Sequence, residues 1–199
     1  MSQWASNLLD TLLPGRSVGG PAQRFSAELV FGFGAFELLA TGAFCLTELT
    51  WGTAMLGVIY AVMWVPILLI LIWLRNGGDP VRASTALMVV LFTLITVTNL
   101  STGGQALGAN IALPTVVLFA VLMSSPRVAI FWTTLVVIEI IVVSQLRNST
   151  LDFPITPKPE WTASAIDRVP LFFSLASALI ALITRRALQH FQVSLEEAR

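Results

Sequence analysis

The sequence predicts an all-α integral membrane protein: a six-helix bundle with both termini in the cytoplasm and a last helix that extends into a cytoplasmic coiled coil. The first observation behind this prediction is composition, because 56% of the 199 residues are hydrophobic and only 11% are charged. Soluble domains carry about 25% charged residues. The second observation is that apolar segments of about 20 residues recur along the chain, the length a helix needs to cross the hydrocarbon core. We therefore expect a multi-pass protein that contacts membrane lipid.

Six segments are candidate membrane spans. Glu37 interrupts the first, the second is the clearest, and the fourth is short enough to be a re-entrant segment or a buried helix instead. The six segments are Ala27 to Leu46, Trp51 to Leu74, Ala83 to Leu100, Asn110 to Ser124, Val128 to Leu146 and Ala165 to Thr184.

Charge placement favours six spans. Cytoplasmic loops carry an excess of Lys and Arg, so the more basic side is expected to be the cytoplasmic one. With six spans, that side receives Arg16, Arg24, Arg75, Arg82, Arg127, Arg185, Arg186 and Arg199. The other side receives only Arg147, Lys158 and Arg168. Without the fourth span, Arg185 and Arg186 would lie opposite the earlier basic residues.

Three parts are expected along the chain: an inner-leaflet segment (1–24), a membrane domain (25–186) and the start of a cytoplasmic helix (187–199). In the first part, apolar residues recur at helical spacing until Pro14-Gly15, which predicts an amphipathic helix on the inner leaflet. The alternative is a tail that orders only against the membrane domain. The recurring residues are Trp4, Leu8, Leu9, Leu12 and Leu13.

Several functional classes are excluded by residue counts. The net charge of zero argues against a nucleic-acid partner. The single cysteine, Cys45, rules out an internal disulfide and a Cys-based metal cage, and the single histidine, His190, leaves no intramembrane haem ligands. No Ser-His-Asp set, HExxH motif or phosphate-binding P-loop is present. We therefore expect no catalytic or metal site in this chain, and no cofactor follows from its residues.

A regular stripe begins in the last predicted span and continues beyond it. Its members are alternately three and four residues apart, which is a heptad register. The first four are small, as helix contacts in lipid require, and the later ones are larger on average, as contacts in water require. The stripe comprises Ser174, Ser177, Ala181, Thr184, Leu188, Phe191, Leu195 and Ala198. It predicts a parallel homodimer and signal transmission through this helix, unless the membrane half packs within its own bundle.

Two carboxyl groups, Glu37 and Glu139, fall inside predicted spans. An ionised carboxylate at that depth is costly, so both are expected to face the bundle or a cavity. They indicate a polar pocket, a proton-linked switch or a cation path; the alternative is a hydrogen bond that only helps the helices pack.

Polar residues and glycines also cluster between the third and fourth spans. Glycine frees backbone groups for a ligand, and amide side chains supply both donors and acceptors. The alternative is a simple turn between helices, and aromatic residues in helices are more often packing than binding. The predicted ligand-binding set is Glu37, Asn99, Gly103, Gly104, Gln105, Asn110, Glu139, Trp64 and Trp132.

The layout resembles the six-helix membrane sensor modules that precede bacterial histidine kinases, diguanylate cyclases and class III adenylyl cyclases. The resembling features are the Leu-Leu-Asp-Thr-Leu-Leu-Pro leader (Leu8 to Pro14), the short loops, and the exit through Arg185-Arg186 into Leu195 to Arg199. The resemblance implies the bacterial inner membrane and a small lipophilic ligand. RegB-type redox sensors carry a Gly-Gly-x-x-Asn-Pro-Phe quinone loop here, of which this chain has Gly103-Gly104 without the Asn-Pro-Phe.

These observations predict a sensory receptor module that passes a signal from a small, lipophilic ligand to a cytosolic output enzyme. No helix stop signal precedes Arg199, so we expect a kinase or nucleotide cyclase to follow it. One alternative is a small substrate-binding membrane component of a transporter. Another is a passive dimerising anchor for an enzyme.

Overall fold

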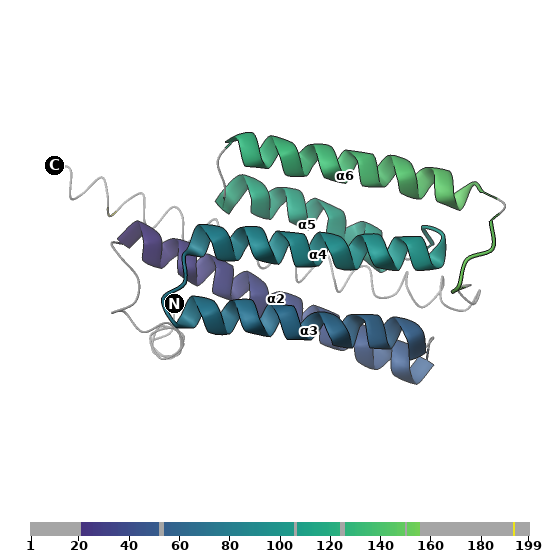
Figure 1. Ribbon diagram of the computed structural model, residues 1–199, viewed down its shortest axis with the longest axis horizontal. Coiled ribbons are helices and arrows are strands. Elements are labelled where there is room, and N and C mark those ends of the chain that lie inside the picture. The colour runs from purple at the N-terminus through teal and green to yellow at the C-terminus, as the bar shows by residue number, and fades with distance from the viewer. Residues whose placement is uncertain are drawn as a thin grey trace. The chain divides into compact units, whose positions relative to one another are not determined.

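A computed structural model describes residues 21–51, 54–105, 107–123, 126–149, 151–155 and 193 of the chain (Figure 1). All regular structure in the described residues is helical, which confirms the all-α class. The five helices of this part are α2 (Pro21–Trp51), α3 (Ala54–Arg75), α4 (Pro80–Thr102), α5 (Leu107–Met123) and α6 (Pro126–Arg147).

Four of these helices, α2, α3, α4 and α6, are long and apolar enough to cross a membrane. The chain is therefore a multi-pass membrane protein. The described residues correct the prediction of six spans, because the fourth predicted segment forms α5, a helix of 17 residues. At 1.5 Å per residue α5 is about 26 Å long, shorter than a hydrocarbon core of about 30 Å. The sixth predicted span, both termini and the coiled coil lie outside the described residues.

The first two spans also differ from the predicted bounds. Residues 47–50, expected as a short outer loop, belong to α2, which continues to Trp51. Its 31 residues correspond to about 47 Å, so the helix is longer than the hydrocarbon core requires. Threonine hydroxyls at Thr47 and Thr50 donate to the carbonyls of Ala43 and Leu46, four residues earlier, and so let polar residues continue the helix.

Helix α4 is central among the described helices. It packs against α2, α3, α5 and α6. The other main contacts are between α2 and α3 and between α5 and α6. Half of the residues in its most apolar stretch are buried inside the structure (50%), compared with 33% for α2 and 28% for α3 and α6. Figure 1 shows α4 between α3 and the α5–α6 pair. Polar side chains on α4 therefore have the best chance of meeting residues from several helices.

Small residues let α2 and α3 approach closely. A Cβ atom added at Gly34 would lie 2.6 Å from a Leu71 side-chain carbon, and one at Gly42 would lie 2.6 Å from the Trp64 ring. Since apolar bulk gives no net drive for association in lipid, close van der Waals packing of this kind holds membrane helices together.

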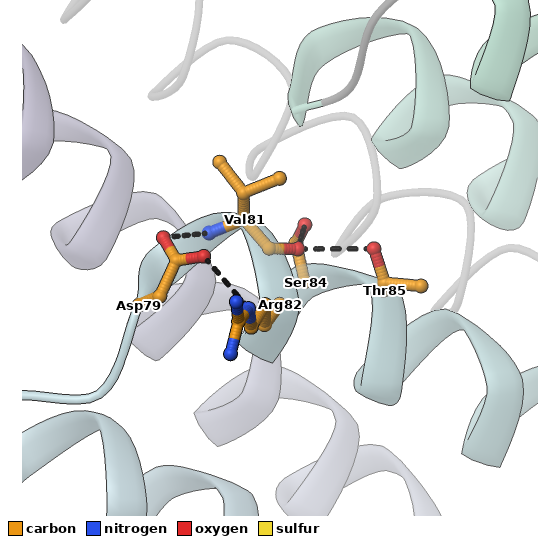
Figure 2. Close-up of polar contacts among 5 residues, drawn as sticks. All are labelled: Asp79, Val81, Arg82, Ser84 and Thr85. Atoms are coloured by element: carbon orange, nitrogen blue, oxygen red, sulfur yellow. Dashed lines mark hydrogen bonds and ion pairs between the residues drawn. The ribbon is translucent and has the colours of Figure 1, made fainter.

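The turn before α4 determines where that helix begins (Figure 2). Asp79 is the N-cap: its Oδ1 accepts a hydrogen bond from the Val81 backbone N–H at 3.2 Å, and Pro80 follows at the first helical turn. The Arg82 Nε lies 3.7 Å from Asp79 Oδ2. The Ser84 and Thr85 hydroxyls both donate to the Val81 carbonyl, at 2.8 and 3.0 Å. These contacts define the start of α4.

Candidate functional site

The best-defined polar contact in the bundle joins α4 to α6. Asn99 Nδ2 donates a hydrogen bond to Glu139 Oε1 at 3.1 Å, between residues 40 positions apart in the sequence. Asn99 is fully buried and Glu139 is 6% exposed. A carboxyl group at membrane depth needs a polar partner, and the amide provides one. The structure thus brings together two of the residues predicted to bind a ligand.

Beside this pair, the hydrogen-bonding capacity of α4 is not fully used. Asn99 Oδ1 is buried and has no hydrogen-bond partner among the residues that the structure describes. Leaving a buried polar atom unsatisfied costs about 1–3 kcal/mol, so native structures rarely do so without reason. An open acceptor at a helix interface therefore marks a candidate site for a bound group.

Thr98 extends the polar region towards α3 and α2. Successive residues of a helix point about 100° apart, so Thr98 and Asn99 face different neighbours. The Thr98 hydroxyl lies beside the Tyr60 hydroxyl of α3. The Glu48 carboxyl group of α2 is close enough to Tyr60 to interact with it electrostatically. We call Glu48, Tyr60, Thr98, Asn99 and Glu139 the polar layer. It draws side chains from four helices.

A glycine turn closes α4 directly beyond the polar layer. Gly103 and Gly104 both have positive φ, 63° and 73°, which an L side chain rarely adopts. Space requires glycine as well: a Cβ at Gly103 would overlap the Phe153 ring, and one at Gly104 would lie 2.8 Å from the Val143 carbonyl oxygen. The Gly104 N–H donates to the Asn99 carbonyl at 2.8 Å. The turn is therefore built onto the same residue that contacts Glu139.

The chain after α6 folds back over this turn. Arg147 Nη2 donates to the Gly104 carbonyl at 2.9 Å. The Ile155 N–H donates to the Ser101 carbonyl at 3.0 Å, and the Ile155 side chain is buried. With Phe153 against Gly103, residues 151–155 form a strap across the C-terminal end of α4.

Glu37 and Trp64 belong to a different interface. The Trp64 Nε1 donates to Thr41 Oγ1 at 2.9 Å, and that hydroxyl donates to the Glu37 carbonyl at 2.6 Å. Glu37 is buried on α2 one turn from Phe33, whose ring stacks on Phe119 of α5 at 3.9 Å. In the part of the chain that the structure describes, no hydrogen bond joins Glu37 to Glu139. A single pocket holding both carboxyl groups stays a prediction.

The remaining predicted ligand-binding residues have different environments: one is packed, one is exposed, and the side chain of the third is not described. Trp132 is buried and meets Phe92 edge to face at 5.8 Å, which is a packing contact. Gln105 is exposed at the end of the glycine turn. Asn110 lies on α5, and its side chain is outside the described set. Among the described residues, no three His, Cys, Asp or Glu side chains lie close enough to hold a metal ion.

Sequence reasoning missed Glu48, Tyr60 and Thr98 as members of the polar layer, and Arg147, Phe153 and Ile155 as members of the strap. Tyr60 is the only tyrosine of the chain and lies in α3, the most apolar of the described spans, a signal that could have selected it. Threonine carries no comparable signal, because its hydroxyl usually bonds to its own helix. The transmission stripe from Ser174 to Ala198 lies outside the described residues.

This chain is thus a helical, multi-pass membrane domain with a buried polar layer beneath a glycine turn. Comparisons with protein-family models, curated proteins and solved structures gave no match.

Proposed function

We propose that this chain is a membrane sensory module that binds a small, lipophilic or amphipathic molecule and signals through its last helix to a cytosolic output enzyme. The observation that carries the proposal is the buried Asn99–Glu139 pair with Asn99 Oδ1 left open. A pair that served only helix packing would be expected to satisfy both ends of the amide. An unsatisfied acceptor inside a lipid-embedded bundle suits a molecule that arrives through the membrane.

The strap supports a route from this site to the last helix. Residues 151–155 contact the glycine turn, and the chain then continues towards the predicted span at 165–184. A ligand beside Asn99 would favour one arrangement of the turn over another, and the strap would pass that difference onward. A ligand can shift such an equilibrium only by its differential affinity for the two states.

The proposal includes the finer features predicted from the sequence. The last helix crosses the membrane, both termini lie in the cytoplasm, and two copies pair in parallel along the stripe that includes Thr184, Leu188 and Leu195. The membrane is the bacterial inner membrane, and the output enzyme is a kinase or a nucleotide cyclase. These features rest on the spacing of the stripe, the arginine distribution and the resemblance to known sensor modules.

Fusing the chain to the catalytic domain of an adenylyl cyclase tests the proposal. We expect the Glu139→Gln variant to change cyclase activity in membranes by about fivefold or more, the size of a modest coupling energy. We expect Leu188→Asp and Leu195→Asp to abolish this response, because they place charge on the predicted dimer stripe. Gln192→Asp is the matched control, since Gln192 lies between stripe positions.

Other outcomes would assign the chain to another class. Cyclase activity that stays constant in all variants at Glu37 and Glu139 would contradict the receptor proposal and indicate a passive anchor. Uptake of a small solute into liposomes that contain only this chain would indicate a transport component.

A further inference from the structure

The polar layer contains more hydrogen-bond acceptors than donors. Glu48 and Glu139 contribute carboxyl oxygens, and Asn99 Oδ1 can only accept. The donors are the Asn99 amide, which is directed to Glu139, and the hydroxyls of Tyr60 and Thr98, which lie beside each other. Backbone N–H groups in the middle of α4 are committed to the helix. Among the described residues, the layer therefore lacks a donor for Asn99 Oδ1.

The position of the open acceptor restricts what could supply that donor. Neither Asn99 nor its neighbour Thr98 has any exposed surface. Both lie within the last turns of α4, directly before the turn that the strap covers. The strap and glycine turn separate this layer from the nearer end of the bundle, while the outer faces of α3 and α6 expose valine, leucine and isoleucine side chains. A group that reaches the layer through lipid must be attached to an apolar body.

We propose that the polar layer binds a membrane-soluble molecule through an O–H or N–H donor on its head group, with Asn99 Oδ1 as the acceptor. This inference rests on the proposed sensory function and specifies its ligand. Molecules of the same shape that can only accept hydrogen bonds bind more weakly. A head group with a positive charge gains a further attraction from Glu139 when that carboxyl group is ionised.

Two isomers provide a direct test. 1-Undecanol and decyl methyl ether have the same atoms and similar shape, but only the alcohol donates a hydrogen bond. With the full chain in phosphatidylcholine nanodiscs, the ligand-dependent rise in Tm is measured at equal membrane mole fractions. We expect the alcohol to bind about 3- to 10-fold more tightly than the ether, the value of one neutral hydrogen bond. Undecylamine forms the third arm and reports whether a cation is preferred.

Variants locate the effect in the polar layer. Asn99→Leu removes the acceptor and should abolish the preference for the alcohol. Thr98→Val is the matched control, because it removes the hydroxyl beside Tyr60 and leaves the acceptor in place, so the preference should persist. Should Asn99→Leu fail to fold, the comparison of the two isomers on the unchanged protein still decides the outcome.

The results separate this inference from the sensory function. Equal binding of alcohol and ether, or no binding of any probe, would overturn the donor inference and indicate that a buried water satisfies Asn99. The sensory function would then depend on the cyclase fusion alone. Donor-selective binding with a silent cyclase fusion would support the ligand site and contradict signalling.

Discussion

Different contacts hold the α2–α3 interface and the α4–α6 interface together. At the first, glycines bring the helices close, and the Thr41 hydroxyl both accepts from Trp64 and donates to the Glu37 carbonyl. At the second, one amide–carboxyl hydrogen bond joins the helices and leaves Asn99 Oδ1 open. The first has the properties of a structural contact. The second keeps capacity for another molecule, which is why we assign function there.

The largest effect is expected at the turn that covers the α4–α6 interface. The Gly103→Val variant places a β-branched side chain at φ +63° and against the Phe153 ring. Backbone strain of about 1–2 kcal/mol and overpacking of about 1–3 kcal/mol should together lower the free energy of unfolding by about 3 kcal/mol. Thermal unfolding in nanodiscs measures the change. Gly32→Val is the control, since a Cβ at Gly32 meets no atom within 4 Å. Equal losses in both variants would show that the turn is not special.

An intermediate effect is expected at the amide–carboxyl pair. Glu139→Leu removes the acceptor and leaves the Asn99 amide without its partner, at a cost of about 2 kcal/mol. Adding Asn99→Leu removes the stranded amide, so stability should recover while cyclase output in the fusion stays altered. Ile140→Leu, at an exposed position next in sequence, is the control for α6. Failure of the double variant to recover stability would mean that the pair is needed for folding, like the α2–α3 contacts.

The smallest effect is expected at the α2–α3 interface. Trp64→Phe keeps the aromatic ring against Gly42 and removes only the hydrogen bond to Thr41, at a cost of about 1 kcal/mol. We expect no change in cyclase output, because Trp64 lies outside the polar layer. A large change in output would instead join this interface, and Glu37 with it, to the signalling site.

Much of the fold could be predicted from the sequence, because length and hydropathy are local properties. The segments around α3, α4 and α6 were found to within a few residues. The number of spans was wrong for the described residues because hydropathy does not distinguish a short apolar helix such as α5 from a complete span.

Less of the candidate site could be predicted. Asn99, Gly103, Gly104 and Glu139 were selected as rare polar or flexible residues in an apolar context, and the structure places them at one end of α4 and on the facing part of α6. Trp132 was selected in the same way and forms a packing contact with Phe92. The residue type indicated that such positions were unusual, but it did not distinguish binding from packing.

The sequence by itself determined that this protein is helical, that it lies in a membrane, and that Glu139 needs a polar partner there. Only the tertiary structure decided that the partner is Asn99, that Tyr60 meets Thr98, and that Phe153 covers Gly103. The physical reason is that helices in lipid are apolar on both their lipid-facing and protein-facing sides. Periodicity therefore cannot reveal how each helix is rotated, and that rotation selects which side chains meet.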